Sequence, residues 1–224
     1  MKALLTSSEF RGCGILEQVE KLAGKSADKI SVGIIIEAVA TEKGDKRWLI
    51  DGLSEVSSAF GGEIDIINLL ALNKDEVLRR VEAVDVIFCF GGSCEWLKIV
   101  FEKSGFLQEL PKLLEDKVWI GSSAGSMILG KMPDEKLQSY FYQVEDFFGV
   151  KSYLDYLGFE IIPHIWGNFV PSDSFEKCLE WSKSNKNVMY ILSDNSAVCV
   201  DGEKVWLVGE KACKILNGKI LEEI

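Results

Sequence analysis

The sequence predicts an α/β fold: a doubly wound, mostly parallel sheet with helices on both faces and antiparallel β-hairpins at the C-terminal end. Two patterns and the composition predict it. Short apolar runs alternate with segments of helical period along most of the chain, which is typical of βαβ units. In the last part of the chain, Asp201-Gly202 and Asn217-Gly218 interrupt short β-rich runs and favour hairpins. Apolar residues make up 47% and charged residues 27%, as in ordinary folded domains.

The elements follow from the same patterns, taken in chain order. Strands are expected at the short apolar runs 2–7, 31–38, 63–69, 85–92, 118–121 and 159–164. Helices are expected where apolar residues recur at helical spacing, at 14–26, 45–61, 74–83, 93–117 (one or two helices) and 172–184. Hairpins are expected within 196–224. Since no repeat, low-complexity tract or linker divides the chain, residues 1–224 are expected to form one domain.

Charge and cysteine usage exclude several classes of protein. The net charge of −10 and the lack of a basic cluster argue against nucleic acid and anionic membranes as partners, and no apolar run is long enough to cross a membrane. The six cysteines are scattered without a CxxC pair, so we expect a reduced, cytoplasmic protein with neither structural zinc nor another metal. Without a glycine-rich nucleotide motif, no cofactor is expected either. The cysteines are Cys13, Cys89, Cys94, Cys178, Cys199 and Cys213.

A serine motif lies between a predicted strand and a predicted helix. Residues 121–125 read GSSAG and fit G-x-S-x-G, with Ser123 at the centre. In a nucleophile elbow the strand-to-helix turn is so tight that the neighbours must be small, and the serine is exposed above the sheet edge. The backbone N–H of Ala124 would then face an oxyanion. The alternative is an ordinary small-residue turn with close helix–sheet packing.

The chain contains one histidine, His164, which follows the apolar run at 159–162. Its position near the end of a strand is where sites assemble in open α/β sheets, so it is the candidate general base. A lysine base is the alternative, but no lysine follows an apolar strand in a comparable way. Trp166, just after the histidine, is the aromatic residue that we expect to face the site.

Two glycines, Gly91 and Gly92, lie at the end of the predicted strand at 85–92. They allow a sharp turn that could direct an N–H outward as a second oxyanion donor. An ordinary strand-to-helix turn would explain them equally well.

Together these stretches resemble the dipeptidase E and cyanophycinase family of serine peptidases. The resemblance covers nearly the whole chain and includes LLTSS near the start, the glycine turn, GSSAGS, the Pro-His pair and SDNSAVCVDGEKV. It implies a class I glutamine amidotransferase-like fold, with Ser123 as nucleophile, His164 as base, and Gly92 and Ala124 as oxyanion-hole amides. Serine in place of the cysteine of the amidotransferases indicates amide hydrolysis.

The chain departs from the family at two points. The family's Gly-Gly-Gly-Asn turn reads FGGS here, at residues 90–93. The resemblance also implies an acidic triad residue between serine and histidine, near residues 138–142, where this chain has no carboxylate. Glu135 and Glu145 flank that position and are the candidates. If neither orients His164, the chain would be a catalytically degenerate relative that acts as a binding or regulatory protein.

The function expected is a serine peptidase-like hydrolase that cleaves a small peptide or peptide-like amide, with dipeptidase activity as the narrower expectation. A small peptide is therefore the expected partner, and the chain is expected to be a monomer or a homodimer. An α/β-hydrolase shares G-x-S-x-G but fits less well, because substantial β structure follows His164. Pairing of the first two strands in antiparallel fashion would favour that alternative.

Overall fold

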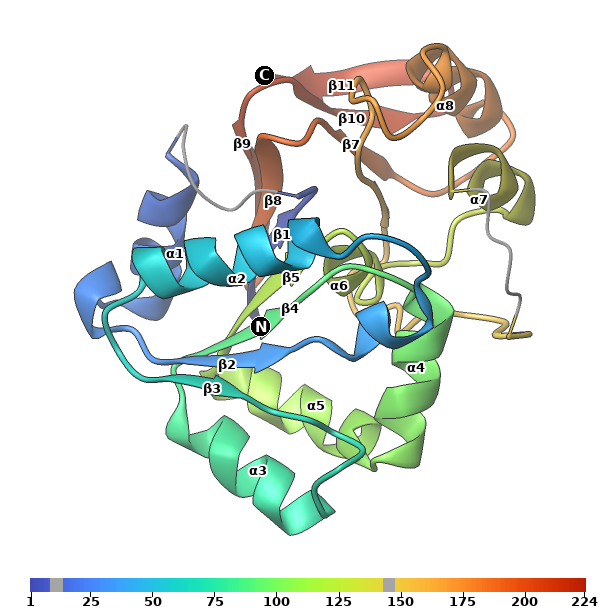
Figure 1. Ribbon diagram of the computed structural model, residues 1–224. Helices are drawn as coiled ribbons and strands as arrows, with labels where there is room; N and C mark the ends of the chain where they lie inside the picture. The colour runs from blue at the N-terminus through green and yellow to red at the C-terminus, as the bar shows by residue number, and fades with distance from the viewer. Residues whose placement is uncertain (9–13, 143–147) are drawn as a thin grey trace.

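The computed structural model describes residues 1–8, 14–142 and 148–224, and its strands form two sheets (Figure 1). The larger sheet has seven strands in the order β3-β2-β4-β5-β1-β8-β9. Its first five strands in that order are mutually parallel, whereas β8 and β9 are antiparallel to their neighbours. The bounds are β1 (Lys2–Thr6), β2 (Val32–Ile35), β3 (Ile64–Ile66), β4 (Val86–Cys89), β5 (Val118–Ser122), β8 (Ser196–Asp201) and β9 (Lys204–Gly209).

The smaller sheet has four strands in the order β11-β10-β7-β6. β6 and β7 are parallel, and β10 runs antiparallel to β7 and to β11. The bounds are β6 (Glu160–Ile162), β7 (Met189–Leu192), β10 (Ala212–Leu216) and β11 (Lys219–Glu223). Strand β7 was not predicted, because its four apolar residues form a short run between polar segments without a turn dipeptide. The segments that directly follow β6 and β7 carry two side chains of the candidate active site described below.

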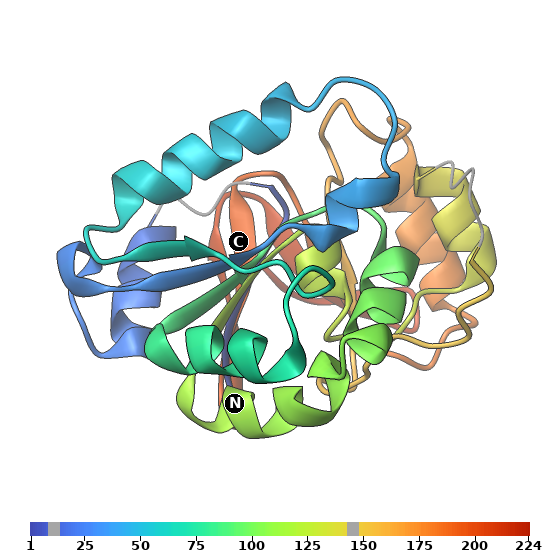
Figure 2. The ribbon, with the colours of Figure 1, turned by 60° about the horizontal axis from the view of Figure 1, so that its bottom comes forward.

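Helices cover both faces of the larger sheet, as Figure 2 shows with α2 on one side and α3, α4 and α5 on the other. One face packs on α1 and α2 through residues such as Leu4, Val19 and Phe88. The opposite face packs on α3, α4 and α5 through residues such as Leu5 and Trp119. The helix bounds on these faces are α1 (Ile15–Ala23), α2 (Arg47–Ala59), α3 (Lys74–Ala83), α4 (Cys94–Lys103) and α5 (Phe106–Asp116).

The smaller sheet has its own apolar cluster against α7 (Glu135–Tyr142) and α8 (Ser174–Ser182). Two short 3₁₀ helices, η1 (Ala27–Lys29) and η2 (Glu37–Thr41), and the short helix α6 (Ala124–Met127) complete the secondary structure of the described residues. The predicted fold class is confirmed, including the antiparallel hairpins β8–β9 and β10–β11. Their turns use positive φ at Gly202, Asn217 and Gly218, as turn dipeptides of this kind require.

Strand order brings several chain segments to one edge of the larger sheet. β4, β5 and β1 are neighbours and parallel, so their carboxyl ends meet at this edge. β8 is antiparallel to β1, with Ala197 opposite Thr6, so the beginning of β8 lies there too. β1 and β2 are not neighbours, because β5 and β4 lie between them. The pairing that would favour an α/β-hydrolase is therefore not found.

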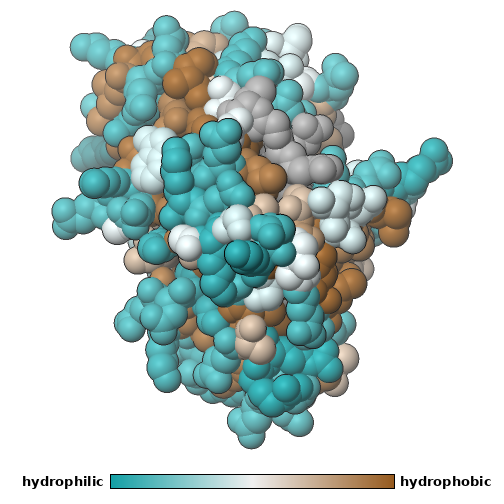
Figure 3. Space-filling model, turned by 90° about the vertical axis from the view of Figure 1, so that its left-hand side faces the viewer, coloured by the Kyte–Doolittle hydropathy of each residue, from teal (hydrophilic) through white to brown (hydrophobic). Residues whose placement is uncertain are grey.

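Charged side chains lie mainly at the surface. The face drawn in Figure 3 is covered largely by hydrophilic residues, with hydrophobic residues in smaller groups between them. Within the described ranges, the buried charged residues are Glu37, Glu95 and Glu160. No helix in the described part of the chain is long and apolar enough to span a membrane.

Candidate active site

Ser123 lies at the tight turn between β5 and α6. Its backbone has φ 49° and ψ −111°, a region that non-glycine residues rarely adopt and that costs on the order of 1–3 kcal/mol. Hydrogen bonds hold this conformation: the Ser123 N–H donates to the Thr6 carbonyl at 3.1 Å, and its own carbonyl accepts from Ser126 and Met127 at 2.9 Å each. A sharp, strained turn of this kind between a strand and a helix is the backbone conformation that a nucleophile elbow requires.

The glycines on both sides of Ser123 allow backbone segments to approach closely. A Cβ atom on Gly121 would lie 2.4 Å from the Gly125 carbonyl oxygen. One on Gly125 would lie 2.0 Å from the carbonyl oxygen of Cys89, at the end of β4. Both distances are far below van der Waals contact, so side chains at either position would displace the turn. The small residues of GSSAG are thus explained by packing of the elbow against β4.

His164 reaches Ser123 from the smaller sheet. It follows β6, and its Nε2 lies 2.9 Å from Ser123 Oγ. Its backbone is in the left-handed region, with φ 67°, and the neighbouring Ile165 N–H donates to the Leu192 carbonyl at 3.0 Å. The base expected from the sequence and the expected nucleophile are therefore in hydrogen-bond contact, although they come from different sheets.

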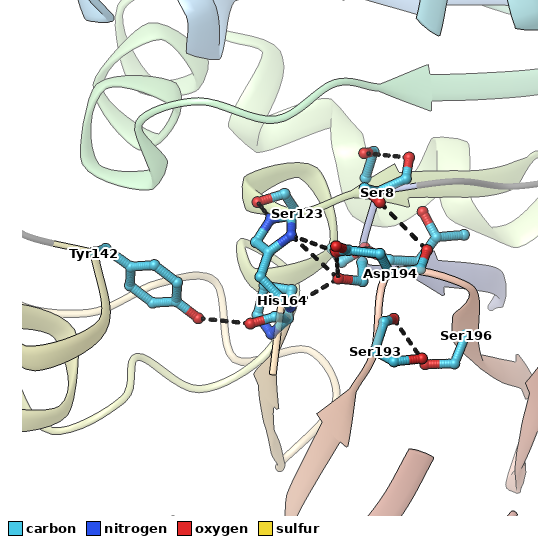
Figure 4. A network of polar contacts seen from close by, with 12 residues as sticks. Ser8, Ser123, Tyr142, His164, Ser193, Asp194 and Ser196 are labelled. Atoms are coloured by element: carbon cyan, nitrogen blue, oxygen red, sulfur yellow. Dashed lines mark hydrogen bonds and ion pairs between the residues drawn. The ribbon is translucent and has the colours of Figure 1, made fainter. Parts of the chain in front are cut away.

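The carboxylate beside His164 is that of Asp194 (Figure 4). Its Oδ1 lies 2.7 Å from His164 Nδ1, whereas the other ring nitrogen, Nε2, contacts Ser123. Asp194 lies in the short connection between β7 and β8. β7 is parallel to β6, so the ends of both strands lie on the same side of the smaller sheet. β8 begins beside the end of β1. The connection between β7 and β8 therefore passes close to both His164 and Ser123. Ser123, His164 and Asp194 have the connectivity of a Ser-His-Asp triad.

Of the two carboxylates named as candidates from the sequence, Glu135 is not the partner of His164, because His164 Nδ1 contacts Asp194. Glu135 is the exposed first residue of α7, and Glu145 lies outside the described residues. At the position expected from the resemblance, Gln138 is buried, donates to the Pro133 carbonyl and accepts from the Tyr153 hydroxyl. The acid follows the histidine in sequence instead of preceding it. The hypothesis of a degenerate relative rested on a missing carboxylate and on the altered turn at 90–93, and Asp194 removes the first of these reasons.

The ionisation of Asp194 fits its place beside His164. The hydrogen bond from His164 holds the pKa of the Asp194 carboxyl below its ordinary value, against burial, which raises it. The charge of the imidazolium and hydrogen bonds from Ser7 and Ser8 lower it further. An ionised carboxylate at this position can fix the imidazole tautomer and stabilise the imidazolium.

The glycine turn after β4 lies against Ser123. A Cβ atom on Gly91 would lie 3.0 Å from Ser123 Cβ. Gly92 has φ 131°, and a Cβ atom there would lie 2.2 Å from the Ala38 carbonyl oxygen. The next residue, Ser93, donates its N–H to that carbonyl and caps α4 with its hydroxyl. The Gly92 turn and Ala124, at the start of α6, are thus both close to Ser123. Because Ala124 is the first residue of a helix, its N–H has no acceptor within that helix.

The aromatic residue against the histidine is Phe169 and not Trp166. The ring of Phe169 is 5.0 Å from the His164 ring, and 66% of the residue is exposed. Trp166 packs on Phe175 and lies under the Lys211 ammonium. Sequence alone does not distinguish the two aromatic residues, because both follow His164 within one loop.

The comparison with protein families and the comparison with solved structures both found matches. The model of peptidase family S51 matches residues 3–208. The chain also resembles the crystal structure of a proposed peptidase E protein from Listeria monocytogenes EGD-e, with a TM-score of 0.73, 18% identity, and coverage of 92% of this chain and 96% of that one. A peptidase from an acI-B1 actinobacterium has a TM-score of 0.69 and 16% identity, with 100% and 92% coverage. These two structures share the fold. A comparison of the sequence with curated proteins found no match.

Proposed function

The chain belongs to peptidase family S51 and is a serine-type peptidase, and we propose that it cleaves small peptides, dipeptides among them, through Ser123, His164 and Asp194. The observation that carries the proposal is the continuous set of contacts from Ser123 Oγ through both ring nitrogens of His164 to Asp194 Oδ1. Dipeptides are included because the sequence resembles the dipeptidase E family, and a structural relative from Listeria is described as a peptidase E protein.

In the proposed reaction, Ser123 Oγ attacks the carbonyl carbon of the scissile amide while its proton passes to His164 Nε2. The Asp194 carboxylate holds Nδ1–H and stabilises the imidazolium. The developing oxyanion is bound by the N–H groups of Gly92 and Ala124. The imidazolium then gives its proton to the leaving amine, which departs and leaves an acyl-enzyme. Water, deprotonated by the same imidazole, hydrolyses the ester and restores the serine.

The turn at 90–93 is compatible with this role despite its difference from the family pattern. Phe90 is buried against Phe88 at 4.7 Å and lies close to Gly52 of α2, where a Cβ atom would be 2.7 Å from the ring. Ser93 forms the N-cap of α4. Phe90 and Ser93, the residues by which this turn differs from the family pattern, thus make contacts within the protein. In the proposed function the Gly92 amide binds the substrate.

Labelling with a fluorophosphonate tests the nucleophile. The wild type should be labelled and Ser123→Ala should not, because only an activated serine reacts at a useful rate. Ser122→Ala is the matched control: its hydroxyl donates to the Ser8 carbonyl at 3.3 Å, so this variant should still be labelled. Labelling that persists in Ser123→Ala, or is absent from the wild type, would exclude Ser123 as an activated nucleophile.

Hydrolysis of a peptide panel tests the substrate class. Dipeptides, tripeptides and longer peptides with free and acetylated N-termini are incubated with the wild type and with Ser123→Ala, and the products are identified by mass spectrometry. We expect release of amino acids from dipeptides by the wild type alone. Cleavage of only the longer peptides would retain the peptidase and exclude the dipeptidase.

A further inference from the structure

Ser7 lies directly after β1, at the junction of the three side chains described above. It is completely buried. Its hydroxyl oxygen accepts a hydrogen bond from the backbone N–H of His164 at 2.7 Å and donates to Asp194 Oδ1 at 3.1 Å. Its own N–H donates to the carbonyl of Ser196, the first residue of β8, at 3.3 Å. One residue thus contacts the main chain of the histidine, the side chain of the acid and the strand that follows the acid.

The direction of the Ser7 hydroxyl follows from these contacts. Because the oxygen accepts from the His164 N–H, its proton is free to point at Asp194 Oδ1. The same Oδ1 is 2.7 Å from His164 Nδ1, and Ser7 Oγ lies 3.4 Å from that nitrogen. The carboxylate oxygen therefore receives two donors, which fix its position relative to the ring.

The backbone of His164 explains why such support is needed. A histidine at φ 67° is in a sparsely populated conformation, and such conformations persist where surrounding contacts hold them. The His164 N–H donates to the Ser7 hydroxyl oxygen, and this hydrogen bond helps to hold the backbone in that conformation. Without it, the partly buried N–H of His164 would lose this acceptor, at a cost of up to that of a lost hydrogen bond.

We propose that Ser7 is a positioning residue that holds His164 and the Asp194 carboxylate in register with Ser123. This proposal rests on the proposed function, since it concerns the same three side chains. The hydroxyl acts in two ways: it anchors the main chain of the base, and it shares the charge of the acid. The proposed role is indirect, because Ser7 acts through its contacts with His164 and Asp194.

The single histidine of the chain makes a direct test possible. In protein labelled with ¹⁵N-histidine, every imidazole signal belongs to His164, and its titration can be followed without any substrate. In Ser7→Ala, Asp194 Oδ1 loses one donor and attracts the imidazolium more strongly. The midpoint of the titration in Ser7→Ala should therefore lie above that of the wild type.

Ser182→Ala is the matched control. Ser182 is also completely buried, and its hydroxyl also donates one hydrogen bond, to the Leu179 carbonyl, and accepts one, from the Gly218 N–H. It lies in α8, and none of its hydrogen bonds involves the triad side chains. A residue that acts by packing alone should behave like this control, with an unchanged imidazole titration.

Kinetics and a conservative variant complete the test. In Ser7→Ala, kcat for peptide hydrolysis should fall about ten- to a hundredfold, as expected for the loss of one hydrogen bond to a charged group, with little change in KM. Ser7→Thr retains the hydroxyl and should restore the titration midpoint and much of kcat. A midpoint in Ser7→Ala that equals those of the wild type and Ser182→Ala would overturn the proposal.

The two proposals fail in different ways. If the wild type is not labelled by the fluorophosphonate, the proposed function fails, whereas the imidazole titration still reports whether Ser7 acts on His164. If the wild type is labelled and Ser7→Ala has the wild-type midpoint and kcat, only the role of Ser7 is excluded.

Discussion

The two sides of the site are built in different ways. Ser123 is held by residues 121–126, a continuous segment, together with the backbone of β1 and β4. His164 and Asp194 are 30 positions apart in sequence and are joined to each other and to Ser7 by side-chain hydrogen bonds. Close backbone packing defines the first side, and a polar network at the meeting point of two sheets defines the second. Substitutions on the first side should therefore affect stability and activity together, and those on the second side mainly activity.

The largest expected effect on activity concerns Asp194. In Asp194→Asn the imidazole loses the carboxylate that fixes its tautomer, so kcat should fall by a factor on the order of 10⁴. The melting temperature at neutral pH should fall by only a few degrees, because the Asp194 side chain is 41% exposed and its contribution to stability is small. Steady-state kinetics and thermal unfolding of the same preparation provide both readouts.

Glu135→Gln is the control for that variant, since this exposed carboxylate was a candidate from the sequence. It should retain wild-type kinetics. Loss of activity in Glu135→Gln with retention in Asp194→Asn would reverse the assignment of the acid.

On the serine side, Gly125→Ala should impair stability and activity together. The new Cβ would lie 2.0 Å from a backbone oxygen at the end of β4, so the elbow or β4 must shift. We expect a loss of about 1–3 kcal/mol in the free energy of unfolding, the usual cost of overpacking, and a matching loss of labelling at Ser123. Urea unfolding and fluorophosphonate labelling measure the two.

Gly24→Ala is the control for Gly125→Ala, because it introduces backbone strain far from the site without steric crowding. Gly24 has φ 66°, a Cβ added there would have no atom within 4 Å, and the residue ends α1, ahead of β2. The variant should lose some stability and keep full labelling. If Gly125→Ala is as stable and as reactive as the wild type, close packing does not define the elbow.

The acid side should also show a pH dependence of stability. Because the pKa of Asp194 is lower in the folded state than its ordinary value, the carboxylate contributes stability that is complete above about pH 4–5 and is lost as pH falls through the folded-state pKa. Urea unfolding from pH 6 to pH 3 should therefore show a steeper acid loss in the wild type than in Asp194→Asn. Equal slopes in the two proteins would contradict the contribution of Asp194.

The smallest effect is expected away from the site, at Glu160 of β6. Burial raises the pKa of this carboxyl, although Asn185 and Asn187 donate to one of its oxygens. The folded state therefore binds the proton more tightly than the unfolded state, and stability falls as pH rises from about 4 through the raised pKa. Glu160→Gln should flatten that part of the profile and change the free energy of unfolding at neutral pH by less than about 1 kcal/mol. An unchanged slope between pH 4 and pH 7 would contradict this.

Much of the fold could be predicted because each βαβ unit has its own local pattern. The predicted strand at 118–121 and the small residues after it are adjacent in sequence, so the elbow could be recognised from spacing alone. β7 was missed because four apolar residues without turn signals have no distinctive period. Its omission also concealed Asp194, two residues beyond its end, although that residue lies in the polar segment before the predicted hairpins.

The sequence by itself determined the elbow at Ser123, the presence of a single histidine after a strand, and the hairpins at Asp201-Gly202 and Asn217-Gly218. These depend on the conformational needs of neighbouring residues, which sequence spacing records. Only the tertiary structure decided that Asp194 pairs with His164 and that Ser7 contacts both. Those contacts depend on the parallel pairing of β6 with β7 and on the place of β8 beside β1. Such long-range pairings leave no periodic trace in the segments that they bring together.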